Sequence, residues 1–206
     1  MTRKLIQFIF LGLFFILVLN GKMMLWLGLF LISLIGAKFF GRFYCGYMCP
    51  MGTAMGYTDR LSKKLKWQTK NVPKWLESKA LPWIILLLMI VTMVFSKRIM
   101  QKEMPLLILL MVLSVLVTLR FEERVFHNHL CPFGALLSFS GKWASFSTTV
   151  DASQCIGCKK CEKVCPSGAV KVDALTKIAQ IDSSICHQCT ACIDACPQNT
   201  IHYQHR

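Results

Sequence analysis

The feature that most constrains this chain is a cysteine motif that occurs twice near its end. Residues 155–166 and 186–197 both follow the pattern C-x2-C-x2-C-x3-C-P, offset by 31 positions. Two-residue gaps let three thiolates bind three corners of an iron–sulfur cube, while the fourth cysteine, beside a proline, reaches the other cube. Zinc sites need no such duplication, and disulfides are rare in reducing compartments. The motif therefore predicts two [4Fe–4S] clusters.

The same spacing predicts a crossed set of ligands. The ligands of cluster 1 are expected to be Cys155, Cys158, Cys161 and Cys196. The ligands of cluster 2 are expected to be Cys186, Cys189, Cys192 and Cys165. Such clusters exchange single electrons, and this region shows no nucleophile–base pair, so we expect no catalytic residue. We expect His187, inside the second motif, to be an exposed residue rather than a ligand.

Residues 148–206 resemble a complete bacterial two-cluster ferredoxin module. The resemblance implies a small α+β fold with a hairpin and a helix in each half. Local patterns agree, because residues 169–172 and 178–181 alternate as short strands do. Residues 148–151 and 200–203 are expected to pair as terminal strands.

The first 149 residues have a different composition. They hold 18 of the 24 Lys and Arg residues and only three of the 11 cysteines. Four stretches are apolar around their whole circumference: Leu5–Leu19, Met23–Phe40, Leu81–Phe95 and Met104–Leu119. A soluble bundle needs polar outward faces, and these stretches lack them. We therefore expect four membrane helices, at the short end of spanning length.

The predicted fold is an all-α four-helix transmembrane region over residues 1–149, followed by a small α+β ferredoxin-like domain with two [4Fe–4S] clusters over residues 150–206. The short links between spans, residues 20–22 and 96–103, hold only four Lys and Arg residues. The N-terminus, the loop over residues 41–80 and the segment after the fourth span hold nearly all the others. The positive-inside rule then places both termini and the ferredoxin domain in the cytoplasm of a multi-pass protein in a bacterial-type inner membrane. The charge thus reports orientation in the membrane. Membrane lipid is an expected partner, and no motif indicates nucleic acid.

A second repeat, offset by 82 positions, lies in the membrane half. The sequence RFYCGYMCPMG at residues 42–52 aligns with RVFHNHLCPFG at residues 124–134, each after a hydrophobic hairpin. Repeats of this kind often share a site at their junction. A further metal or redox site is therefore one interpretation of four residues, Cys45, Cys49, His127 and Cys131. The other interpretation is that each Cys-Pro-x-Gly only turns the chain and its thiols are inert.

With the ferredoxin tail behind it, this repeat resembles the NapH-type membrane iron–sulfur proteins and the related carboxyl-terminal parts of NosR- and CcoG-like proteins. The resemblance implies that the chain passes electrons between the quinone pool and partner subunits, as the electron-transfer subunit of a quinol dehydrogenase-type oxidoreductase. The family pattern has Cys where this chain has His127.

Two other functions remain open. The chain could itself oxidise quinol, because four proton-accepting side chains follow the fourth span: Glu122, Glu123, His127 and His129. Alternatively, it is an assembly or redox-regulatory factor of a respiratory metalloenzyme. The three thiols outside the tail, which form no complete cluster motif, favour this last function.

Overall fold

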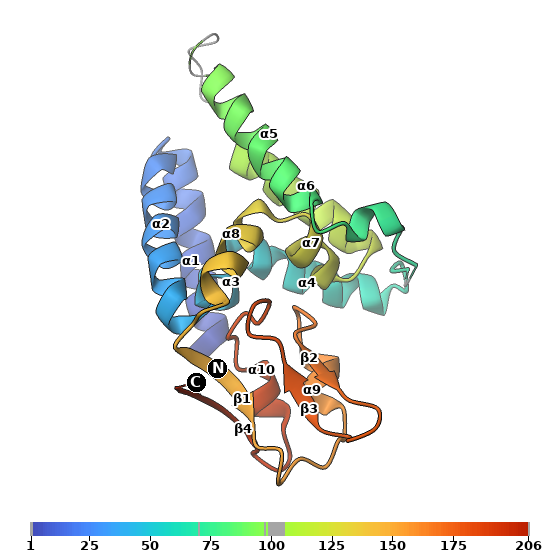
Figure 1. Ribbon diagram of the computed structural model, residues 1–206. Coiled ribbons are helices and arrows are strands. Elements are labelled where there is room, and N and C mark those ends of the chain that lie inside the picture. Colours follow the sequence, from blue (N-terminus) through green and yellow to red (C-terminus); the bar gives the residue numbers. More distant parts are fainter. Residues whose placement is uncertain (1, 70, 97, 99–105, 206) are drawn as a thin grey trace. The chain divides into compact units, whose positions relative to one another are not determined.

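The computed structural model describes residues 2–69, 71–96, 98 and 106–205 (Figure 1). The chain is helical as far as Gly141 and α+β beyond it. It divides into two compact units. The first unit joins Met1–Pro50 to Leu136–Arg206, and the second unit comprises Met51–Ala135.

Three helices begin the first unit: α1 (Thr2–Leu19), α2 (Met23–Phe40) and α3 (Phe43–Tyr47). A link of three residues folds α1 back along α2, and the two helices lie side by side (Figure 1). The ring of Phe14 meets that of Trp26 edge to face, with centroids 5.2 Å apart. The large apolar side chains on the outer faces stay exposed, 84% for Leu19 and 71% for Ile35.

The second unit contains nearly all of α4 (Pro50–Lys64), then η1 (Lys74–Glu77), α5 (Leu81–Phe95), α6 (Leu106–Arg120) and α7 (Glu123–His129). The Ser62 hydroxyl of α4 donates to the carbonyl of Leu119 at 2.6 Å. The Gln68 side-chain amide donates to the Asp59 carboxylate at 2.8 Å and to the carbonyl of Thr118 at 3.1 Å. These bonds hold the segment after α4 against the end of α6.

The four apolar stretches predicted as helices are helical, as α1, α2, α5 and α6. Within the described residues only α2 is long and apolar enough to cross a membrane, while α5 and α6 are shorter apolar helices. Residues 97 and 99–105, which include most of the predicted second link, lie outside the described part. The four-span region therefore stays a prediction.

The repeat offset by 82 positions is also a structural repeat. Helix α6 follows α2 at this offset within a residue or two, and α7 follows α3. Helices α4 and α8 (Pro132–Gly141) both begin at the proline of the Cys-Pro pair. The two copies differ at the arginine that opens each motif. Arg42 is 1% exposed, whereas Arg124 is exposed and forms an ion pair with Glu122 at 2.6 Å.

The ferredoxin-like tail contains two small antiparallel sheets. Strand β1 (Phe146–Val150) pairs with β4 (Ile201–His205), and β2 (Val170–Val172) pairs with β3 (Ala179–Ile181). The helices α9 (Lys160–Val164) and α10 (Ala191–Ala195) lie within the two cysteine motifs, and they contact each other. Both predicted strand pairings are confirmed. Strand β1 begins at Phe146 and so runs across the expected domain boundary at residues 149–150. That boundary stays a prediction.

Within the first unit the tail packs against the N-terminal helices. The Tyr203 hydroxyl donates to the carbonyl of Phe40 at 3.2 Å, and the ring of Phe146 stacks on both residues. Gly46 of α3 lies against the second cysteine motif, so that a Cβ built on Gly46 would stand 2.4 Å from the carbonyl oxygen of His187. This contact is between backbones and leaves no room for a side chain.

We predict that Gly46→Ala destabilises the first unit, because overpacking of this kind costs about 1–3 kcal/mol. The expected result is a lower thermal midpoint, measured by circular dichroism on the purified full chain. The matched control is Gly28→Ala in α2, where a Cβ would meet nothing within 4 Å. Alanine normally favours a helix over glycine, so the control midpoint should hold or rise. Equal midpoints for the two variants would contradict the prediction.

Candidate metal centres

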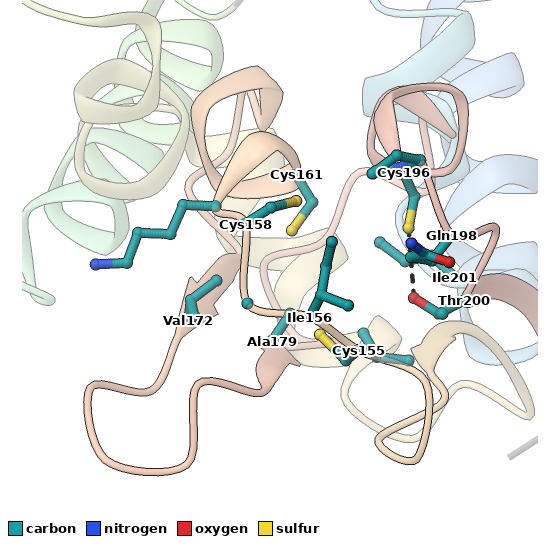
Figure 2. A pocket seen from close by; sticks show the side chains of 14 residues that line it. Cys155, Ile156, Cys158, Cys161, Val172, Ala179, Cys196, Gln198, Thr200 and Ile201 are labelled. Carbon is teal, nitrogen blue, oxygen red and sulfur yellow. Dashed lines mark hydrogen bonds between the residues drawn. The ribbon is translucent and has the colours of Figure 1, made fainter.

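Four cysteines line one pocket of the tail, which we call the first site. Three come from the first motif and one from the end of the second: Cys155, Cys158, Cys161 and Cys196 (Figure 2). Aliphatic side chains complete the walls, among them Val172 and Ile201. The donor set fits a [4Fe–4S] cube, since four thiols from two distant segments face one cavity with apolar walls.

The other four tail cysteines form the second site. Burial raises the pKa of Cys186 and of Cys192 to about 12. Burial also raises the pKa of Cys189. The charge of Cys165 raises all three pKa values further, so the last cysteine of the first motif lies among the thiols of the second. Metal binding would have to displace these protons, as it does in other thiolate sites.

The last cysteine of each motif contacts a hydroxyl group. Cys196 Sγ lies 3.3 Å from Thr200 Oγ1 (Figure 2), and Cys165 Sγ lies 3.5 Å from Ser167 Oγ. Burial raises the pKa of Cys196, but hydrogen bonds from Thr200 and from nearby backbone amides outweigh it, and the pKa is lowered. Hydrogen bonds to cluster sulfurs are one means by which a protein sets reduction potential.

The two motifs also share an unusual backbone. Residues with positive φ recur at the offset of 31: Gly157 and Gln188 (64° and 51°), Lys159 and Thr190 (both 60°), and Gly168 and Asn199 (66° and 51°). The sequence repeat is therefore a repeat of loop conformation, which turns the chain around each set of thiols.

Gln188 is a site residue that sequence reasoning missed. It stands where the first motif has glycine, in a conformation that is unfavourable for a residue with a side chain. Its side-chain oxygen accepts hydrogen bonds from the amide and hydroxyl of Thr148 at 3.1 and 2.7 Å, and its amide donates to Ser147 at 3.2 Å. These bonds fasten the second motif to β1. The departure from glycine at this offset was the available signal.

Arg3 is a second residue that sequence reasoning missed, and His187 differs from its prediction. The Arg3 guanidinium donates to the carbonyl of Cys189 at 3.1 Å, and its charge opposes the effect of burial on the pKa of that thiol. His187 is 3% exposed, so the prediction of an exposed residue is wrong. The reason is that α3 covers the loop, with Gly46 against the His187 carbonyl.

The two sites differ in their access to solvent. In the second site Cys186, Cys189 and Cys192 are all buried. In the first site Cys158 is exposed, and Cys155 is half-buried. Cys165 of the second site and Cys196 of the first are half-buried as well, and Cys161 of the first is buried. The first site, with its exposed Cys158, is therefore the more open of the two.

The four cysteine and histidine residues of the other repeat are buried. In the first unit, Arg42 Nη2 lies 3.8 Å from Cys45 Sγ, and Cys49 directly precedes α4. In the second unit, the Gly134 amide donates to Cys131 Sγ at 3.3 Å, and His127 lies on α7. In the part of the chain that the structure describes, no three His, Cys, Asp or Glu side chains surround a place for a single metal ion.

The residues considered for quinol oxidation lie at or on α7. Glu122 is paired with Arg124, as described above. Burial lowers the pKa of His129, while the nearby Glu77 carboxylate opposes this shift. His129 is thus held closer to the neutral form that accepts a proton.

Comparisons with known proteins indicate iron–sulfur binding in both halves of the chain. Residues 154–200 match the family model described as a 4Fe-4S dicluster domain, and residues 23–68 and 103–149 match a 4Fe-4S binding domain. Putative electron transport protein YccM of Escherichia coli is 26% identical over 78% of this chain and 50% of its own length. Methylamine utilization ferredoxin-type protein MauN of Methylobacillus flagellatus is 28% identical over 62% and 49%.

Protein NirI of Paracoccus denitrificans is 26% identical over 66% of this chain and 23% of its own length. The chain spans about half the length, or less, of the relatives that it matches. No solved structure gives a significant match. The chain thus carries 4Fe-4S ferredoxin-type domains, and its relatives include proteins named for electron transport.

Proposed function

We propose that this chain is a membrane-anchored iron–sulfur electron-transfer protein of the NapH type. It passes electrons between the quinone pool and redox partner subunits through two [4Fe–4S] clusters. The observation that carries the proposal is the pairing of two four-thiol sets, each built from both motifs. We assign cluster 1 to the first site and cluster 2 to the second. When bound, each cluster supplies one-electron exchange.

The chain's own residues hold and insulate these sites. The thiols supply the ligands, and the aliphatic core of the tail keeps water out: Val170, Ala179 and Ile201 are each less than 5% exposed. Exclusion of water and hydrogen bonding around the sulfurs are the means by which a protein tunes such a centre.

We further propose that the second site is the one that exchanges electrons with the membrane side of the protein. Its loop contacts the N-terminal helices at several points, including the Arg3 bond to Cys189 and the backbone approach at Gly46. Gln7 of α1 donates to the Gly46 carbonyl at 2.9 Å and so connects the same helices to α3. Such a contact favours electron transfer because it fixes the distance between the second site and the N-terminal helices and excludes solvent between them.

Membrane anchoring is supported by the apolar helices. Large apolar side chains are exposed along α1, α2, α5 and α6, such as Ile9, Ile32, Leu87 and Leu109 at 59–70%. Patches of this size on a water-soluble monomer are rare and indicate contact with lipid or another protein. The distribution of Lys and Arg supports the cytoplasmic side for both termini.

The alternative is an assembly or redox-regulatory factor. Inducible depletion in growing cells separates the two functions, because a conduit is needed at every turnover. We predict that quinol-linked electron flux falls in step with the loss of the protein. Flux that persists until the partner enzyme is diluted by growth would indicate an assembly factor.

We predict that Cys196→Ala destroys the cluster of the first site, although Cys196 belongs to the second motif. Removal of one thiolate exposes an iron to water and oxygen. Electron paramagnetic resonance of the reduced protein should show the same remaining signal as in Cys158→Ala. A spectrum matching that of Cys192→Ala instead would refute the crossed assignment.

We predict about 8 iron atoms per chain, four for each of two cubes. A triple variant, Cys45→Ala, Cys49→Ala and Cys131→Ala, should keep the same metals and the same spectrum. A count of about 12 irons that falls to about 8 in the triple variant would instead assign a further cluster to Cys45, Cys49, His127 and Cys131. Elemental analysis detects any other metal there.

A further inference from the structure

The first site opens onto the surface at a short loop. Cys158 is exposed, and the neighbouring Ile156, which lines the same pocket, is 59% exposed (Figure 2). Lys159 lines the pocket as well. Residues 156–159 therefore form one place where the first site meets solvent.

Lysines gather around this opening. The Lys177 backbone packs on the loop, since its carbonyl would stand 2.4 Å from a Cβ built on Gly157. Lys160 and Lys163 lie on α9, the helix that begins directly after the loop. All of these side chains are exposed. We call Lys159, Lys160, Lys163 and Lys177 the lysine surface.

The charge of the tail is strongly polarised. Residues 156–177 hold five lysines and two acidic residues, Glu162 and Asp173, whereas the rest of the tail from residue 150 holds one arginine and three aspartates. Apolar side chains are exposed among the lysines, at 93% for Leu175 and 43% for Val164. Apolar contacts within a charged rim are typical of a protein interface.

We infer that the lysine surface docks an acidic, soluble one-electron carrier. This inference rests on the proposed function, because it needs a redox centre in the first site. One electron passes between that site and the carrier, so that one is oxidised as the other is reduced, with no bond formed and no proton transferred. Charge complementarity selects an acidic partner. The first site is the outlet because its Cys158 is exposed, whereas three of the four thiols of the second site are buried.

The test uses the purified full chain in detergent and an acidic flavodoxin as the probe. Binding of the oxidised probe is measured by calorimetry at low and high salt, and its reduction by the dithionite-reduced protein is followed by absorbance. In Lys159→Gln/Lys160→Gln/Lys163→Gln, binding at low salt should weaken by about tenfold, and the reduction rate should fall with it. High salt should remove most of the difference.

The matched control is Lys64→Gln/Lys74→Gln/Lys79→Gln, which removes three exposed lysines from residues 64–79. The control should bind as the wild type does. Equal binding by the test variant, or equal binding of a basic cytochrome c by the wild type, would overturn the inference. The iron content of the same preparation is measured as well, and it separates the proposed function from the inference about the lysine surface. A chain without iron refutes the proposed function, while the salt-dependent binding of the probe still reports on the lysine surface.

Discussion

The arrangement of the first unit depends on one close approach of two backbones. Gly46 of α3 lies against the His187 carbonyl in the second cysteine motif, with no space for a Cβ between them. Around this contact Arg3 reaches Cys189, and Gln188 is bonded to β1. The loop that carries three thiols of the second site is therefore held from two sides, by the N-terminal helices and by the terminal strand.

This contact makes two identical motifs unequal. Residues 186–189 of the second motif are buried and have Arg3 beside them, whereas Cys158 and Lys159 of the first motif are exposed. Burial disfavours the added negative charge of a reduced centre, and nearby cations and hydrogen bonds favour it. Under the proposed function, the two sites differ in their surroundings and not in the type of their ligands, and this difference would let them serve two dissimilar partners.

Much of this structure follows from patterns of short range. The apolar stretches form the expected helices, and the strand pairs 170–172 with 179–181 and 146–150 with 201–205 match the alternation in the sequence. The sequence repeats at offsets of 31 and 82 positions each correspond to two copies of the same local structure. These features depend on neighbours along the chain, which a sequence displays directly.

The features that sequence reasoning missed depend on packing between distant segments. The ion pair of Arg124 is local, because Glu122 lies two residues before it where the first copy has Phe40. The burial of Arg42 is not local, since its side chain packs against Gly141. His187 is buried only because α3 covers it. Gln188 occupies a glycine position because its side chain bonds to β1, 40 residues earlier.

The central proposal is that the second site connects the membrane side to the first site on the path of electrons. Quinol-driven reduction in anaerobic native membranes tests it directly, with each site removed in turn. Without the first site, in Cys158→Ala, the remaining cluster should be reduced as fast as in the wild type. Without the second site, in Cys192→Ala, the remaining cluster should stay oxidised. Reduction of that cluster at the wild-type rate would contradict the account.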